Sequence, residues 1–116
     1  MGFKLGRENR GFKSHKNVKL HRKELEPGVL GEAYNDGSIA VDSSVDPGSA
    51  LDKKIQRHET IHAKEMQSGR ISYGDDYIRA DGKTYPRKDG KIKYNGVWRE
   101  EGWDGFPWEK RAQKAE

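Results

Sequence analysis

The segment from Ser49 to Gly69 restricts the fold of this chain more than any other part of the sequence. Ser49 and Asp52 have the spacing of a capping box at a helix start, and Gly69 is a typical residue just beyond a helix end. Between them, several residues recur at steps of three and four, which places them on one helix face: Leu51, Ile55, His58, His62 and Met66. We therefore predict a helix over residues 49–68 whose core-facing side carries both histidines.

His58, Glu59 and His62 form an HExxH sequence in the middle of this helix. Histidines four positions apart lie one turn apart on the same face, so both imidazoles can reach one cation, and the intervening Glu can touch a water molecule beside it. The alternative is a pair of ordinary histidines in a charged helix. The motif predicts a divalent-metal site, and because the chain has no cysteine, only histidine and carboxylate side chains can serve as its ligands.

A catalytic zinc site needs a third protein ligand and an open position. Glu109 is the favoured candidate because it lies in the first turn of a second expected helix, Trp108 to Ala115, where Ala112 would allow close approach to the first helix. Its alternative role is a solvated Glu that stabilises a helix start. Further candidates are His15, His21, Glu65, Asp75, Asp76, Glu100 and Glu101.

The rest of the sequence predicts short antiparallel strands. Residues 29–34 and 38–42 flank an Asn-Asp-Gly turn and predict a hairpin. Residues 77–100 predict a β meander because they contain three further turn pairs, Asp81-Gly82, Asp89-Gly90 and Asn95-Gly96. This order of elements predicts an α+β fold, in which a small sheet and hairpins pack on the HExxH helix beside a short C-terminal helix.

Residues 1–28 differ from the rest in charge and in lacking a sustained periodicity. Residues 1–26 hold eight Lys or Arg and three Glu, an excess of five positive charges in a chain of net charge +4. We expect an extended basic N-terminal arm over residues 1–28 and one domain over residues 29–116. Because only 31% of the residues are hydrophobic, the domain is expected to draw stability from a bound metal or a partner.

The arm suggests contacts with other proteins through residues 1–26. Nucleic acid is not expected as the main partner, because the arm lacks a recognisable binding fold. No apolar run approaches the length of a membrane span.

The HExxH helix, the upstream hairpin and the segment Phe106-Pro107-Trp108-Glu109-Lys110-Arg111-Ala112 resemble minimal gluzincin-type zinc metallopeptidase domains found in phage genomes. Residues 1–6 and the same C-terminal segment are similar to short virion-associated peptidase-like proteins of tailed marine bacteriophages. The resemblance covers the whole chain, and HExxH is its most specific part.

This resemblance implies that His58, His62 and Glu109 bind Zn²⁺ and that Glu59 is the general base of a zinc-dependent peptidase. It implies that residues 38–42 offer a strand edge to an extended protein substrate. It also implies a place in the phage particle after synthesis in the host cytoplasm, with neighbouring phage structural proteins as partners of residues 1–26. The competing hypothesis is a structural virion protein whose metal only stabilises the fold. The group that would stabilise the oxyanion stays open among Tyr73, Tyr77, Tyr85, Tyr94 and Arg99.

Overall fold

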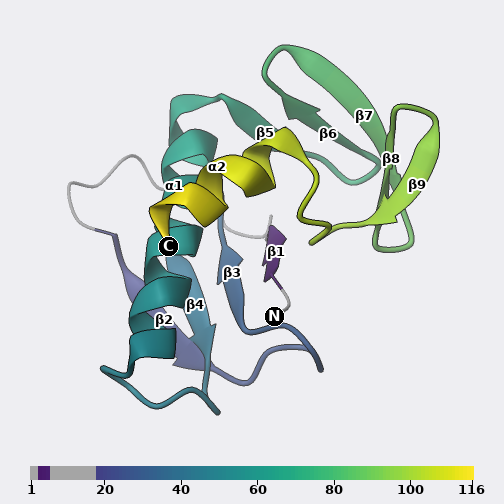
Figure 1. The fold of residues 1–116 in the computed structure, drawn as a ribbon. Helices are drawn as coiled ribbons and strands as arrows, with labels where there is room; N and C mark the ends of the chain where they lie inside the picture. The colour runs from purple at the N-terminus through teal and green to yellow at the C-terminus, as the bar shows by residue number, and fades with distance from the viewer. Residues whose placement is uncertain (1–2, 6–17) are drawn as a thin grey trace.

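The computed structural model describes residues 3–5 and 18–116 (Figure 1). Within these residues, two helices and nine strands in two sheets confirm the predicted α+β fold. One sheet has the strand order β1-β3-β4-β2, and the other follows the chain from β5 to β9. The expectations for residues 1–2 and 6–17, including most of the basic arm and His15, lie outside the described residues.

Helix α1 (Ala50–Ser68) confirms the predicted helix and both of its ends. Ser49 Oγ accepts a hydrogen bond of 3.1 Å from the Asp52 amide, and Gly69 ends the helix at a φ of 83°. One expectation was wrong, because Leu51 is 39% exposed whereas Asp52 is buried. The Asp52 carboxylate is tolerated there because it accepts two hydrogen bonds from Arg22, of 3.0 and 3.1 Å.

The first sheet lies along α1 and contains the predicted hairpin, β3 (Gly31–Ala33) with β4 (Ile39–Asp42). Strand β2 (Leu20–Lys23) pairs with β4 in parallel, so these four residues of the expected arm belong to the sheet. Strand β1 (Phe3–Leu5) pairs with β3 in parallel. The expectation that residues 38–42 offer a free edge was therefore wrong, because β4 is flanked by β3 and β2.

The second sheet contains the predicted meander: β6 (Tyr77–Ala80), β7 (Lys83–Lys88), β8 (Lys91–Tyr94) and β9 (Val97–Glu100). Each of its three turns has two successive positive φ values, for example 53° at Asp81 and 82° at Gly82. Two positive φ values are the mark of the tight hairpin turns that the sequence indicated. Strand β5 (Ile71–Tyr73), which the sequence reading did not predict, joins the meander to α1.

Helix α2 (Pro107–Ala115) has proline in its first turn, as predicted. It packs on α1 (Figure 1). The Trp108 and Phe106 rings are fully buried and stack with centroids 4.6 Å apart. Arg111 donates hydrogen bonds of 2.6 and 3.1 Å to Glu65 of α1. These contacts fix the position of α2 on α1. No helix in the described part of the chain is long and apolar enough to cross a lipid bilayer.

Candidate metal centre

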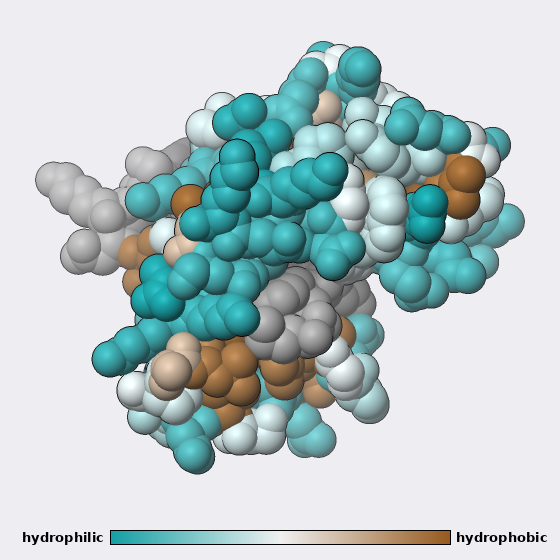
Figure 2. Space-filling view, in the orientation of Figure 1, coloured by the Kyte–Doolittle hydropathy of each residue, from teal (hydrophilic) through white to brown (hydrophobic). Residues whose placement is uncertain are grey.

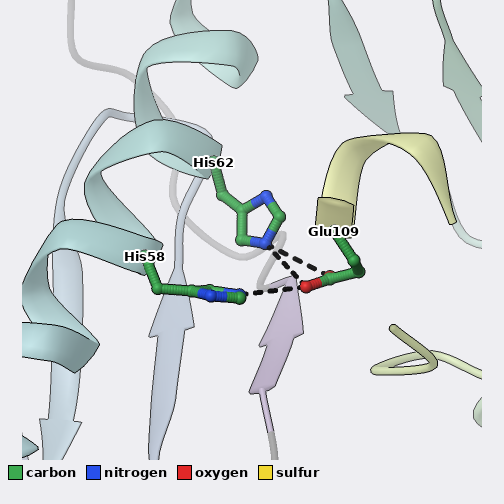
Figure 3. Close-up of side chains that lie close together, drawn as sticks. All are labelled: His58, His62 and Glu109. Atoms are coloured by element: carbon green, nitrogen blue, oxygen red, sulfur yellow. Dashed lines mark hydrogen bonds and ion pairs between the residues drawn. The ribbon is translucent and has the colours of Figure 1, made fainter. Parts of the chain in front are cut away.

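The side chains of His58, His62 and Glu109 converge between the two helices (Figure 3). His58 Nε2 lies 2.9 Å from Glu109 Oε1, and His62 Nε2 lies 3.2 Å from the same oxygen. One ligand atom from each residue falls within 4.8 Å of the other two. The structure thus brings together the three ligands that the sequence suggested.

Local structure explains this convergence. The two histidines occupy one face of α1, one turn apart, with their ring centroids 4.9 Å from each other. Glu109 lies in the first turn of α2, where the helix dipole also favours a carboxylate. Ala112, one turn further, is fully buried and small enough to let the two helices approach. The sequence argument for Glu109 therefore identified the packing correctly.

Three atoms at these separations suit a small divalent cation. A tetrahedral zinc ion with metal–ligand distances of roughly 2.0–2.2 Å keeps its ligand atoms roughly 3.4 Å apart. The measured separations of 2.9 and 3.2 Å are close to that value. Two imidazole nitrogens and one carboxylate oxygen are also a donor set that zinc uses. These residues therefore fit a divalent metal ion.

Glu59 follows His58 directly on α1, is completely buried, and lies close enough to Glu109 for the two carboxyl groups to interact. Neither of its carboxylate oxygens has a hydrogen-bond partner among the described residues. Burial raises the pKa of Glu59 well above its usual value of 4.5, and the nearby carboxylates of Glu109, Glu32 and Glu116 raise it further. A buried carboxyl group without partners is costly, so a cation or a water molecule at this position would relieve an unfavourable arrangement.

Other buried polar atoms at the centre are also without hydrogen bonds to described residues. They are Nδ1 of His62 and Oε2 of Glu109, the latter 3.2 Å from His62 Nε2. Although burial alone would raise it, the two imidazoles hold the pKa of Glu109 below its usual value of 4.5. The surroundings therefore shift the two pKa values in opposite directions, and they favour the ionised form of Glu109 and the neutral form of Glu59.

Two residues at the centre were missed by the sequence reading. Glu116 Oε2 lies 2.5 Å from His58 Nδ1, on the ring nitrogen that does not face Glu109. Gly31 of β3 approaches α1 so closely that a Cβ there would lie 2.9 Å from Glu59 Cγ and 2.7 Å from Ile55 Cγ2. A glycine inside a predicted strand often marks the close approach of another element, so Gly31 could have been noticed in the sequence. Nothing in the sequence points to Glu116.

The other candidate ligands that the structure describes have different partners or positions. Glu65 pairs with Arg111, and Glu101 pairs with Arg87 at 3.0 Å. Glu100 lies 3.9 Å from Lys91, and His21 is exposed on β2. Asp75 and Asp76 are exposed in the turn between β5 and β6. None of these six belongs to the group of potential metal ligands found among the described residues.

The candidate oxyanion donors are placed in the second sheet and have other contacts. The Tyr73 hydroxyl donates to Glu101, and Arg99 stacks over Trp103 at 4.1 Å. Tyr85 and Tyr94 pack against Trp108 in the core. Tyr77 is 39% exposed on the sheet. These contacts give none of the five residues an oxyanion-stabilising role.

Comparisons with known proteins give no independent identification. No family model, no curated protein and no solved structure matches this chain. The functional argument therefore depends on the chemistry of the centre itself.

Proposed function

We propose that this protein is a zinc-dependent peptidase with His58, His62 and Glu109 as metal ligands and Glu59 as general base. The observation that carries the proposal is the buried carboxyl group of Glu59, which has no hydrogen-bond partner among the described residues and lies beside the three-ligand group. A site that served only to bind metal would have no need of a fourth, unpaired acidic group at this position. A hydrolytic site needs a proton acceptor there.

Each residue has a distinct role in this proposal. Zinc, when bound, would polarise the peptide carbonyl and lower the pKa of a water molecule beside it. Glu59 would accept the proton of that water molecule and return it to the leaving amine. A nearby cation would favour ionised Glu59, which offsets the raised pKa that burial produces in the metal-free chain. Gly31 would hold Glu59 in place through close backbone contact.

A second candidate function is a structural metal centre, and one observation favours it. His58, Glu59, His62 and Glu109 are each 1% exposed or less, so the centre as described is closed to a substrate. An enzyme would need a local opening at this point, whereas a structural zinc site is closed by nature. In this alternative the metal stabilises a chain with little apolar material, and Glu59 takes no part in chemistry.

The location and partners belong to the same proposal. We place the protein in a phage particle, with basic residues of the first 26 positions against neighbouring phage structural proteins. The support is the charge of that segment. Strands β1 and β2 both belong to the sheet, so the appropriate test replaces four cations between them, Arg7, Arg10, Lys13 and Lys16, with glutamine instead of deleting the segment. The variant is expected to fold and bind metal but to lose co-sedimentation with particles, and normal incorporation would contradict this placement.

Cleavage of a peptide library with and without a chelator tests the peptidase proposal. The matched variant is Glu59→Gln, which keeps the size and polarity of the side chain but removes the base. An enzyme loses most of its activity, by several orders of magnitude, while it keeps its metal. Glu24→Gln, which removes one charge at an exposed position, serves as the control. If the wild type with bound zinc cleaves nothing, the structural alternative replaces the proposal.

A further inference from the structure

The second sheet has one buried face and one face open to solvent. Residues that alternate along its strands point inward to the core around Trp108, among them Ile78, Ile92 and Tyr94. The opposite face is exposed along all of its strands, which is the usual arrangement for an antiparallel sheet packed on one side. In Figure 2 the lobe formed by β6 to β9, at the upper right, is mostly hydrophilic.

Two large aromatic side chains lie on this open face. Tyr77 is 39% exposed and Trp98 is 42% exposed, and they are the only aromatic residues among the exposed large hydrophobic side chains of the described chain. The strand register places both on the same side of the sheet, because Tyr77 pairs with Pro86 and Trp98 pairs with Lys93. Single exposed aromatic residues are common on protein surfaces, whereas two on one face beside several cations form a candidate binding surface.

Three lysines share this face with the two aromatic residues. Lys88 is two positions beyond Pro86 on β7 and pairs with Lys91 of β8, and Lys93 is next to Trp98. All three are exposed, and Arg79 of β6 adds a fourth cation to the same face. Among its strand residues the face carries one carboxylate, Glu100, which lies 3.9 Å from Lys91, and the exposed Asp75, Asp76 and Asp89 lie in the adjoining turns. A groove of about 540 Å³ continues the surface past Trp98 toward Trp103 and residues 27–29.

From this arrangement we infer that the open face of β6 to β9 binds single-stranded nucleic acid. Its two exposed aromatic residues can stack on bases, while the lysines of the same face neutralise phosphates of the same strand. Positive charge alone would suit any polyanion. Stacking on Tyr77 and Trp98 requires planar rings that are free of a partner base, which selects an unpaired strand over a duplex. This activity is separate from the metal centre and from the basic N-terminal segment.

Fluorescence anisotropy with a labelled oligothymidine of twenty nucleotides tests the inference on the full chain. The key variants are Trp98→Ala, Trp98→Phe and the triple variant Lys88→Gln/Lys91→Gln/Lys93→Gln. The matched control is Lys53→Gln/Lys64→Gln/Lys110→Gln, which removes the same charge from exposed positions on the helices. Because all of these positions are exposed, circular dichroism is expected to show an unchanged fold.

We expect Trp98→Ala to weaken binding about tenfold and Trp98→Phe to retain most of it. The triple variant on the sheet is expected to lower the slope of log affinity against log salt by about two, because each lost phosphate contact contributes about 0.7. The triple variant on the helices is expected to change the affinity and the salt slope less than the triple variant on the sheet does. The difference between the two triple variants is decisive, since the basic N-terminal segment contributes equally to both.

Two results would overturn the inference. If heparin or duplex DNA binds as tightly as the oligothymidine and Trp98→Ala has no effect, the face is a general polyanion surface. If both triple variants weaken binding equally, only net charge matters and the sheet is not the site.

Discussion

His58 Nδ1 lies 2.5 Å from the Glu116 carboxylate, while Nε2 of the same ring lies 2.9 Å from Glu109. A carboxylate that accepts the Nδ1 proton leaves the Nε2 lone pair directed toward a metal ion and fixes the ring orientation. Glu116 is itself held by Lys54 at 3.5 Å, and its backbone oxygen accepts a hydrogen bond of 3.0 Å from Arg57. The two candidate ligand histidines therefore differ, because Nδ1 of His58 has a carboxylate partner and Nδ1 of His62 has no hydrogen-bond partner among the described residues.

The first prediction is that Glu116→Ala lowers zinc affinity about tenfold or more, whereas Glu116→Gln lowers it less because the amide oxygen can still accept from Nδ1. Competition titration with a zinc-binding dye measures the affinity, and nitrogen NMR shifts report the tautomer of His58. Glu24→Ala is the control at an exposed position. Equal affinity and an unchanged tautomer in Glu116→Ala would show that the contact has no role in metal binding.

The second prediction concerns Glu59 in chelator-treated protein. Because burial raises its pKa in the folded state above the usual 4.5, protonation of Glu59 favours folding. That contribution is complete below about pH 4 and is lost as the pH rises through the folded-state pKa. Metal-free Glu59→Gln should therefore gain stability over the wild type as the pH rises from about 4 to 8, at about 1.4 kcal/mol per unit of pKa shift.

Urea unfolding at several pH values in the presence of chelator measures this gain. A stability difference that stays constant across the pH range would mean that Glu59 is solvated in the metal-free protein.

The third prediction concerns the Arg22–Asp52 ion pair, which ties β2 to the start of α1. The guanidinium of Arg22 lowers the pKa of Asp52 to about 2, against the opposing effect of burial. Asp52→Asn should cost roughly 1–3 kcal/mol at neutral pH, because it removes the charge from a buried carboxylate that accepts two hydrogen bonds from Arg22. A depressed pKa stabilises the fold above the unfolded-state value, so this cost should shrink as the pH falls from about 5 to 2.

Thermal unfolding across that pH range provides the measurement, with Asp46→Asn as an exposed control. A pH-independent cost would indicate that the hydrogen bonds of Asp52 to Gly48 and Gln56 matter more than its charge.

Much of this fold was accessible from sequence because local signals agreed with the final packing. The cap at Ser49, the glycine at position 69 and the Asp-Gly and Asn-Gly turns fix backbone angles within a few residues, so they predicted α1 and the meander. The placement of His58 beside His62 was accessible for a similar reason, since helical spacing fixes one relative to the other.

The sequence predictions were wrong where contacts between distant segments determine which residues are buried or paired. Leu51 fits the helical apolar stripe, yet Asp52 is buried because Arg22, thirty positions earlier, pairs with it. Parallel pairing of β2 with β4 has no local signature, so residues 20–23 read as part of an arm. Glu116 contacts His58 across fifty-eight positions, and unlike Glu109 it has no local sequence pattern around it that indicated the contact.

The fourth prediction is that removal of metal destabilises the protein. A chain with 31% hydrophobic residues and a closed metal centre should draw folding free energy from the ion, so a chelator should lower the melting temperature by about 5 °C or more. His62→Ala is the matched variant, because it should unfold at the same temperature with and without chelator. A melting temperature that does not respond to chelator in the wild type would mean that no metal contributes to folding.

The most direct test of the central claim is the zinc content of purified protein, measured by mass spectrometry together with X-ray absorption at the zinc edge. We predict one zinc ion per chain, bound by two imidazole nitrogens and carboxylate oxygen, with this signal lost in His62→Ala and weakened in Glu109→Ala. Glu59→Gln should retain the full zinc content. Absence of stoichiometric zinc and of any other divalent metal from the wild type, or an unchanged ligand signal in His62→Ala, would contradict the assignment of His58, His62 and Glu109 as a metal centre.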